Sequence, residues 1–146
     1  MSTSKKAVRS LVDICALKSL RNVILSPGSR NAPITIGFNK NPLFRCFQIT
    51  DERVAAFFAL GLSQQNRKAS IISCTSGTAV LNYAPAIAEA YYQRIPLIIL
   101  TADRPVQWID QGAGQSIRQR AIYSNYILKS FELPQRIETE QDQWFN

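Results

Sequence analysis

Four short apolar runs, rich in β-branched residues, alternate along the chain with stretches whose apolar residues recur at helical spacing. The runs predict strands at residues 22–25, 44–49, 70–74 and 96–101. Helical spacing predicts a helix before the first strand and further helices over residues 53–65 and 79–92. Asp51 is the expected N-cap of the helix over 53–65. Pro85 should mark the first turns, or a kink, of the helix over 79–92.

The pattern weakens after the fourth run. Residues 102–115 are polar, contain glycine and show no clear period, which predicts a long loop of the kind that is often functional. A short helix at about 116–123 and a strand at 127–133 are expected next. Residues 143–145 resemble the first turn of another amphipathic helix, and the chain stops there. We therefore expect the protein to be C-terminally truncated.

Strands and helices in this alternating order predict an α/β fold, a doubly wound and mostly parallel sheet with helices on both faces. The carboxyl ends of such strands share one edge of the sheet, and ligands bind there. The turns that would lie at this edge are residues 26–30, 50–53, 75–78 and 101–105. Because these turns hold the most distinctive polar residues, we expect one domain over residues 1–146 with its site at this edge.

The composition is that of a globular protein, with 46% apolar and 18% charged residues. No apolar run approaches the roughly 20 residues of a membrane-spanning helix, and the polar N-terminus argues against a signal peptide. Cys15, Cys46 and Cys74 lack metal-ligand spacing, which favours buried, reduced thiols. The chain has no histidine, which excludes a Ser-His-Asp triad within it. We expect a cytoplasmic protein with no membrane partner.

The net charge of +7 first suggests a nucleic-acid-binding protein. Several basic residues lie near the N-terminus, but the others are scattered, and no basic run interleaves with aromatic residues. Small anionic substrates explain the charge equally well. We therefore expect no nucleic-acid partner.

Each turn at the expected edge has a functional and an ordinary interpretation. Pro27 and Gly28 give a tight turn before Arg30, whose planar cation suits a carboxylate but is also common in exposed loops. Residues 75–78 lie between a strand and a helix, where backbone amides favour anions and polar ring atoms, although Ser or Thr there is also an ordinary N-cap. Glu52 is equally an ordinary first-turn acid, unless its side chain points across the sheet edge.

The order of six motifs is far more specific than any one of them. They are Ser-Pro-Gly-Ser-Arg at 26–30, Asp-Glu-Arg at 51–53, Thr-Ser-Gly-Thr-Ala at 75–79, Ala-Glu-Ala-Tyr-Tyr at 88–92, Leu-Thr-Ala-Asp-Arg-Pro at 100–105 and Gly-Ala-Gly-Gln-Ser-Ile at 112–117. From about residue 7 to residue 135 this succession resembles a thiamine-diphosphate enzyme family of menaquinone biosynthesis. The family is that of the 2-succinyl-5-enolpyruvyl-6-hydroxy-3-cyclohexene-1-carboxylate synthases.

The resemblance implies a transferase that decarboxylates 2-oxoglutarate and adds the succinyl-semialdehyde unit to isochorismate. Chains of that family have three α/β domains, and this sequence matches only the first, the pyrimidine-binding domain. The Gly-Asp-Gly segment of the domain that binds diphosphate and Mg²⁺ in the family is absent here. The resemblance therefore implies a fragment that is inactive alone. Its partners would be the missing C-terminal domains and a second subunit of a homo-oligomer.

The resemblance also assigns roles to single residues. Glu52 matches the catalytic acid that activates thiamine diphosphate. The positions that would border the pyrimidine ring are Thr75, Ser76, Gly77 and Thr78. The positions that match substrate-binding residues are Ser29, Arg30 and Gln115. Gly114 stands where the family usually has asparagine, so that contact is lost or passes to the backbone. Arg104 matches a recurrent arginine with a structural or substrate-side role, and no metal ligand is implied in this chain.

Two other hypotheses stay open. Another thiamine-diphosphate decarboxylase or carboligase, such as a relative of acetolactate synthase, would share the activating glutamate. Such an enzyme should lack Ser-Pro-Gly-Ser-Arg with a substrate arginine, so Arg30 and Gln115 favour the menaquinone family. A basic, non-enzymatic binding domain would rest on the net charge alone.

Overall fold

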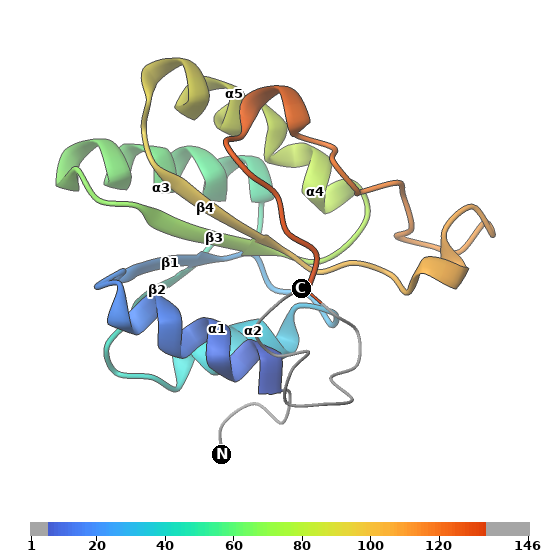
Figure 1. Cartoon of the computed structure of the whole chain (residues 1–146), viewed down its shortest axis with the longest axis horizontal. Helices are drawn as coiled ribbons and strands as arrows, with labels where there is room; N and C mark the ends of the chain where they lie inside the picture. Colours follow the sequence, from blue (N-terminus) through green and yellow to red (C-terminus); the bar gives the residue numbers. More distant parts are fainter. Residues whose placement is uncertain (1–5, 134–146) are drawn as a thin grey trace.

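Four parallel strands form a sheet in the computed structural model, which describes residues 6–133. The strands are β1 (Asn22–Leu25), β2 (Arg45–Gln48), β3 (Ser70–Cys74) and β4 (Leu97–Thr101). Their order across the sheet is β2-β1-β3-β4, so β1 and β3 are central (Figure 1). Val23 of β1 pairs with Cys46 of β2 on one side and with Ile71 of β3 on the other.

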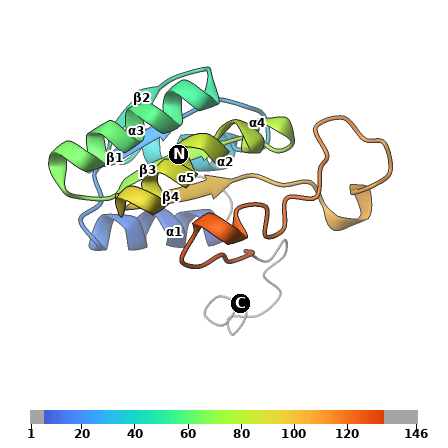
Figure 2. The same cartoon turned by 90° about the horizontal axis from the view of Figure 1, so that it is seen from above.

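Helices cover both faces of this sheet. One face carries α1 (Lys6–Leu17) and α2 (Ala32–Asn39), and the other carries α3 (Glu52–Asn66), α4 (Thr78–Asn82) and α5 (Ala84–Gln93) (Figures 1 and 2). The predicted α/β fold with a parallel sheet covered on both faces is therefore confirmed. Among the described residues, every helix is too short or too polar to cross a membrane.

The two hydrophobic clusters follow from the alternation of side chains along the strands. Ile24 and Ile72 point to the face of α3, α4 and α5, where they pack with buried alanines of α3 such as Ala55. Val23 and Ile71 point to the opposite face and pack against α1 and α2. All five residues of β3 are buried, as expected of a central parallel strand. The small alanine side chains allow α3 to approach the sheet closely.

The expected strands at 22–25, 44–49, 70–74 and 96–101 and the helix over 53–65 are confirmed within one residue at each end. The helix over 79–92 is two helices, α4 and α5, which meet at Tyr83. Pro85 lies in the first turn of α5, which is one of the two expected placements. The helix α2 was not predicted, because its residues are mostly apolar and show little amphipathic periodicity.

Two expectations after β4 are wrong. Residues 116–119 have no regular secondary structure and residues 120–123 form a turn, not a helix; Ala121 has a left-handed backbone (φ 55°) that interrupts helical geometry. Residues 127–133 form no strand, and Leu128 of this run is 98% exposed. An apolar run becomes a strand only when it pairs with another strand, and these residues pair with none in the described chain; of the run, Ile127 packs against the core. Two short 3₁₀ helices, Val106–Trp108 and Ser124–Tyr126, lie in the described chain after β4. The expected helical turn at 143–145 lies outside the described residues.

Candidate functional site

The carboxyl ends of β1 and β3 form the switch point of the sheet. The chain leaves β1 toward β2 on one side, whereas β3 and β4 lie on the other side. Loops that follow the two central strands therefore lead in opposite directions, which is where open α/β sheets bind ligands. The loop after β1 contains Ser29 and Arg30, and the loop after β3 contains residues 75–77.

These two loops are packed against each other through Gly28 and Thr75. A Cβ atom on Gly28 would lie 2.5 Å from the Cβ atom of Thr75, which is closer than real side chains come. Glycine is therefore required at position 28 by close approach to a neighbouring side chain. The contact fixes the loop that carries Arg30 next to the loop that carries Ser76 and Gly77.

Buried polar atoms gather beneath these loops. Thr75 is 7% exposed, and its hydroxyl has no hydrogen-bond partner within the described residues. Asn31 is fully buried and donates from Nδ2 to the carbonyl oxygen of Ser26 over 2.9 Å, whereas its Oδ1 has no described partner. The fully buried hydroxyl of Tyr83 lies beside the side chains of Ser26 and Cys74. Polar groups without partners are costly in a protein interior, so they mark this edge as more than core packing.

Glu52 is the first residue of α3, directly after Asp51 as the N-cap. The Asp51 carboxylate accepts a hydrogen bond from the backbone N–H of Val54 over 2.9 Å, which confirms the expected cap. Glu52 is half-buried, and its Oε2 accepts a hydrogen bond from Nδ2 of Asn82 over 3.2 Å. Asn82 is the last residue of α4, which follows β3. The Glu52 side chain therefore reaches from the helix after β2 toward the helix after β3.

The buried groups near Glu52 stay protonated at neutral pH. Burial raises the pKa of the Cys74 thiol to about 12, and the negative charge of Glu52 contributes to this rise. Burial also raises the pKa of the Tyr83 hydroxyl, with smaller contributions from Cys74 and Glu52. Both side chains can therefore donate a hydrogen at neutral pH. Neither can act as an anionic nucleophile there.

The loop after β3 is joined to the segment around residue 115. The Ser76 hydroxyl donates to the carbonyl oxygen of Gln115 over 2.9 Å. Gly77 has a left-handed φ of 83°, and a Cβ atom on it would lie 2.8 Å from the Cα atom of Gln115. Both the conformation and the approach require glycine at position 77. No side chain of Ser or Thr caps α4, whose N-cap is Gly77 itself, so the ordinary capping interpretation of this turn fails.

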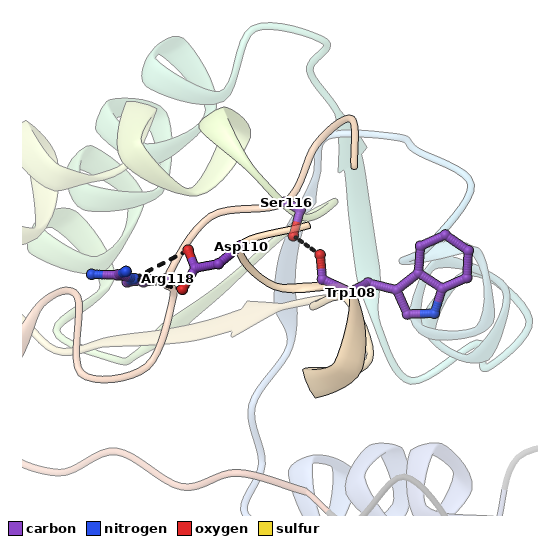
Figure 3. Close-up of polar contacts among 4 residues, drawn as sticks. All are labelled: Trp108, Asp110, Ser116 and Arg118. Atoms are coloured by element: carbon purple, nitrogen blue, oxygen red, sulfur yellow. Dashed lines mark hydrogen bonds and ion pairs between the residues drawn. The ribbon is translucent and has the colours of Figure 1, made fainter. Parts of the chain in front are cut away.

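The long loop after β4 is folded back on itself. Arg104 donates from Nη2 to the carbonyl oxygen of Gly114, and its guanidinium lies 5.9 Å from the ring centre of Trp108. The Ser116 hydroxyl donates to the carbonyl oxygen of Trp108 over 3.2 Å (Figure 3).

An ion pair joins Arg118 to Asp110 in the same region. Nε of Arg118 lies 3.0 Å and 3.2 Å from the two carboxylate oxygens of Asp110 (Figure 3). Both side chains are largely exposed, so the pair contributes at most about 1 kcal/mol to stability. The predicted loop over 102–115 is therefore confirmed as a connection with defined internal contacts.

The structure brings some of the sequence-predicted residues together directly. Ser76 and Gly77 contact Gln115, and Thr75 contacts Gly28 in the loop of Ser29 and Arg30. Arg30 is half-buried, whereas Ser29 and Gln115 are exposed. Thr78 is exposed at the start of α4.

Three residues of this region were not predicted from the sequence, namely Asn82, Tyr83 and Gln119. Asn82 and Tyr83 stand in an alanine-rich stretch that gives no sign of their contacts. A polar residue at 119 among exposed neighbours likewise carries no signal of burial. Their contacts are with residues distant in sequence, so only the folded structure places them in this region.

Residues 5–122 match the family described as "Thiamine pyrophosphate enzyme, N-terminal TPP binding domain". The chain belongs to this family. The expectation of an N-terminal thiamine-diphosphate-binding domain is therefore confirmed, and the sheet edge described above is that of a TPP-binding domain.

The TPP-binding domain is similar to curated relatives named 2-succinyl-5-enolpyruvyl-6-hydroxy-3-cyclohexene-1-carboxylate synthase. The relative from Flavobacterium johnsoniae is 52% identical over 134 residues, which are 92% of this chain and 24% of the relative. The relative from Christiangramia forsetii is 55% identical over 86% of this chain and 22% of its own. The relative from Porphyromonas gingivalis is 47% identical over 98% of this chain and 25% of its own. The chain thus spans about a quarter of the length of these relatives.

The side chains at this edge suit the aminopyrimidine part of thiamine diphosphate. That ring presents nitrogen acceptors and an exocyclic amine, and it therefore needs both a carboxyl group and neutral hydrogen-bonding atoms nearby. Glu52 supplies a half-buried carboxyl group, and Thr75 supplies a buried hydroxyl without a described partner. Gly28 and Gly77 let the two loops approach Thr75 and Gln115 closely, which holds these groups in place. The donor set of this TPP-binding domain fits the ring.

Proposed function

We propose that this chain is the pyrimidine-binding domain of a 2-succinyl-5-enolpyruvyl-6-hydroxy-3-cyclohexene-1-carboxylate synthase of menaquinone biosynthesis. Such a transferase decarboxylates 2-oxoglutarate and adds the succinyl-semialdehyde unit to isochorismate. The observation that carries the proposal is the 52% identity over 92% of the chain to a relative with this printed name. The contact of Glu52 with Asn82 at the switch-point edge supports it.

The proposal assigns this chain only part of an active site. The residues that hold the diphosphate and Mg²⁺ would belong to further domains and to a second subunit, so residues 1–146 alone should not turn over substrate. Support comes from the share of the relatives that the chain covers, about a quarter of their length. The free cysteines of the described residues suit a reducing compartment, which supports a cytoplasmic location for the enzyme.

Glu52 is the proposed catalytic residue. Thiamine diphosphate supplies the electron sink of the decarboxylation when it is bound. The Glu52 carboxyl group would hold a proton at a pyrimidine ring nitrogen, while Asn82 fixes its second oxygen from the side. Thr75, Ser76, Gly77 and Thr78 would border the ring. The anchored position of Glu52 at the start of α3 keeps the proton at one place.

Ser29, Arg30 and Gln115 are the proposed substrate-binding residues. 2-Oxoglutarate and isochorismate each carry two carboxylates, and a planar guanidinium binds a carboxylate at two points. Arg30 sits in a loop that the Gly28–Thr75 contact holds at the edge of the sheet. The carbonyl oxygen of Gln115 is held by Ser76, which leaves its exposed side chain to face a substrate.

A comparison of substrates in the complete enzyme tests this assignment. The protein is assayed with 2-oxoglutarate plus isochorismate and, separately, with pyruvate as the only oxo acid. We expect product from the first pair and none from pyruvate. In the same enzyme, Arg30→Lys should raise the KM for a dicarboxylate substrate about tenfold or more, because lysine loses the two-point contact with the carboxylate. Turnover of pyruvate in place of 2-oxoglutarate would assign the chain to an acetolactate-synthase-like enzyme instead. The matched control is Arg67→Lys, an exposed arginine at the far end of α3.

A further inference from the structure

We propose that Gln119 is a positioning residue of this site. Its side-chain amide would set the loop after β3 relative to the loop after β4, and through that loop the position of Gln115. The inference rests on the proposed function, because it concerns the residues assigned there to cofactor and substrate.

The side-chain amide of Gln119 makes one hydrogen bond through its oxygen and one through its nitrogen. The residue is 8% exposed. Its Oε1 accepts a hydrogen bond from the backbone N–H of Gly77 over 2.7 Å, and its Nε2 donates to the carbonyl oxygen of Ala102 over 2.9 Å. These partners are 42 and 17 residues away along the chain. A glutamine amide has one acceptor oxygen and a donor nitrogen in one plane, so both ends of this side chain are used.

The two partners lie at the ends of neighbouring strands. Gly77 ends the loop after β3 and is the N-cap of α4, and Ala102 directly follows β4. The backbone N–H of Ala102 donates to the carbonyl oxygen of Cys74 over 3.1 Å, which continues the pairing of the two strands. Beyond this last backbone bond between the strands, the Gln119 amide joins Gly77 to Ala102. Gln119 therefore connects the two loops where the backbone pairing of β3 and β4 has ended.

Gln119 also occupies the Gly77 amide that a ligand would otherwise find free. The Gly77 N–H is directed at Oε1 of Gln119, so the loop of residues 75–78 presents its side chains and remaining backbone atoms to the edge. A direct anion contact by this amide is therefore not part of the site.

Gln119 determines the placement of Gln115 through the same loop. Gln115 lies four positions earlier, has a left-handed φ of 54°, and contacts Gly77 and Ser76. The segment over 115–119 is thus attached to the loop after β3 at both of its ends. Loss of the Gln119 bond would leave Gln115 attached through Ser76 alone. The spacing between the proposed pyrimidine loop and the proposed substrate glutamine would then vary.

A buried glutamine that served only stability would behave differently, and the Gln119→Leu variant of the complete enzyme separates the two roles. We expect the KM for isochorismate to rise about tenfold or more. The melting temperature will also fall, since Leu leaves both backbone partners without a bond. The variant is therefore also made with Gly61→Ala, a helix-stabilising change in α3 where an added Cβ atom meets no neighbour within 4 Å. The positioning role predicts that Gly61→Ala restores the melting temperature and leaves the KM raised.

A wild-type KM in Gln119→Leu, or a KM restored by Gly61→Ala, would overturn the proposal. Gln119→Glu serves if the leucine variant does not fold. This variant keeps an acceptor for the Gly77 N–H and, when ionised, lacks the donor for the Ala102 carbonyl oxygen. We therefore expect an intermediate rise of the KM for isochorismate at neutral pH. A wild-type KM would again refute positioning. Gln107→Leu, an exposed glutamine of the same loop, is the matched control.

The outcomes for the proposed function are separate. If the wild-type enzyme makes no product from 2-oxoglutarate and isochorismate, the functional assignment has failed. Positioning is then tested by hydrogen exchange of the Gly77 amide and of residues 112–119 in the same protein. Faster exchange at both places in Gln119→Leu supports the connection, and unchanged exchange in the 112–119 segment contradicts it.

Discussion

The side chain of Asn82 donates a hydrogen bond to the carboxylate of Glu52 over 3.2 Å. The bond joins the last residue of α4 to the first residue of α3. Two helices that follow different strands are thereby connected at the switch-point edge of the TPP-binding domain. In the proposed role of Glu52, Asn82 holds one carboxyl oxygen from the side and the other oxygen would face a ring nitrogen.

Asn82→Ala should lower the kcat of the complete enzyme about fivefold. A hydrogen bond to a charged group contributes about 1.5–3 kcal/mol, and solvent near the exposed Asn82 and half-buried Glu52 reduces this to roughly 1 kcal/mol. Steady-state kinetics at saturating thiamine diphosphate measure the effect. The melting temperature should change little, because the Asn82 side chain is exposed.

Asn66→Ala is the matched control, since Asn66 is an exposed asparagine at the opposite end of α3. It should leave kcat unchanged. Equal effects of the two substitutions would show that the Asn82–Glu52 bond has no part in turnover.

Gly28→Ala should destabilise the domain by about 1–3 kcal/mol, because the new Cβ atom would lie 2.5 Å from the Cβ atom of Thr75. The base of a threonine side chain cannot move without its backbone, so one of the two loops must shift. Denaturant unfolding of the purified chain measures the change. Gly61→Ala should have the opposite sign and stabilise by about 0.5–1 kcal/mol, since helical glycine is unfavourable and the space is open. A Gly28→Ala variant as stable as the wild type would contradict the loop contact.

Much of the fold could be predicted because the central elements obey local rules. The apolar runs around Val23 and Ile71 are strands buried on both faces, and Asp51 is a side-chain N-cap whose position follows from sequence. Residues after β4 could not be predicted in the same way. Their conformation depends on partners distant in sequence, such as Val80, whose carbonyl oxygen accepts a hydrogen bond from the Tyr123 hydroxyl.

The candidate site residues could be named from the sequence for a different reason, and their roles stay a prediction. Glu52, Arg30 and the loop over 75–78 stand out as polar residues directly after strands, and parallel strands bring such residues to one edge. Asn82 and Gln119 lie outside these turns. Their roles come from hydrogen bonds that span 30 and 42 residues, and no local pattern encodes such a distance.

The stability of the domain should fall as pH rises above the ordinary thiol range, in part because of Cys74. Burial raises the pKa of this thiol from 9.0 to about 12 in the folded chain. Between these values the folded chain keeps the proton that the unfolded chain loses, so folding is progressively weakened as pH increases. The slope from this one group approaches about 1.4 kcal/mol per pH unit at most.

Cys74→Ala should therefore reduce the loss of unfolding free energy between pH 8 and pH 10 relative to wild type. Denaturant unfolding at a series of pH values gives the slope, which is compared instead of the absolute stability because the substitution itself removes buried volume. Cys46→Ala is the control, since Cys46 is only partly buried and should change the slope less. Identical slopes for wild type and Cys74→Ala would contradict the raised pKa.

The proposed role of Glu52 is tested most directly by deuterium exchange of the thiazolium ring proton of thiamine diphosphate bound to the complete enzyme. Glu52→Gln keeps the size and the hydrogen-bonding contact with Asn82 but cannot hold the proton at the pyrimidine nitrogen as an acid. With equal cofactor occupancy and an unchanged circular dichroism spectrum, the exchange rate should fall by roughly 10²- to 10⁴-fold. An exchange rate in Glu52→Gln within about twofold of the wild type would contradict the account.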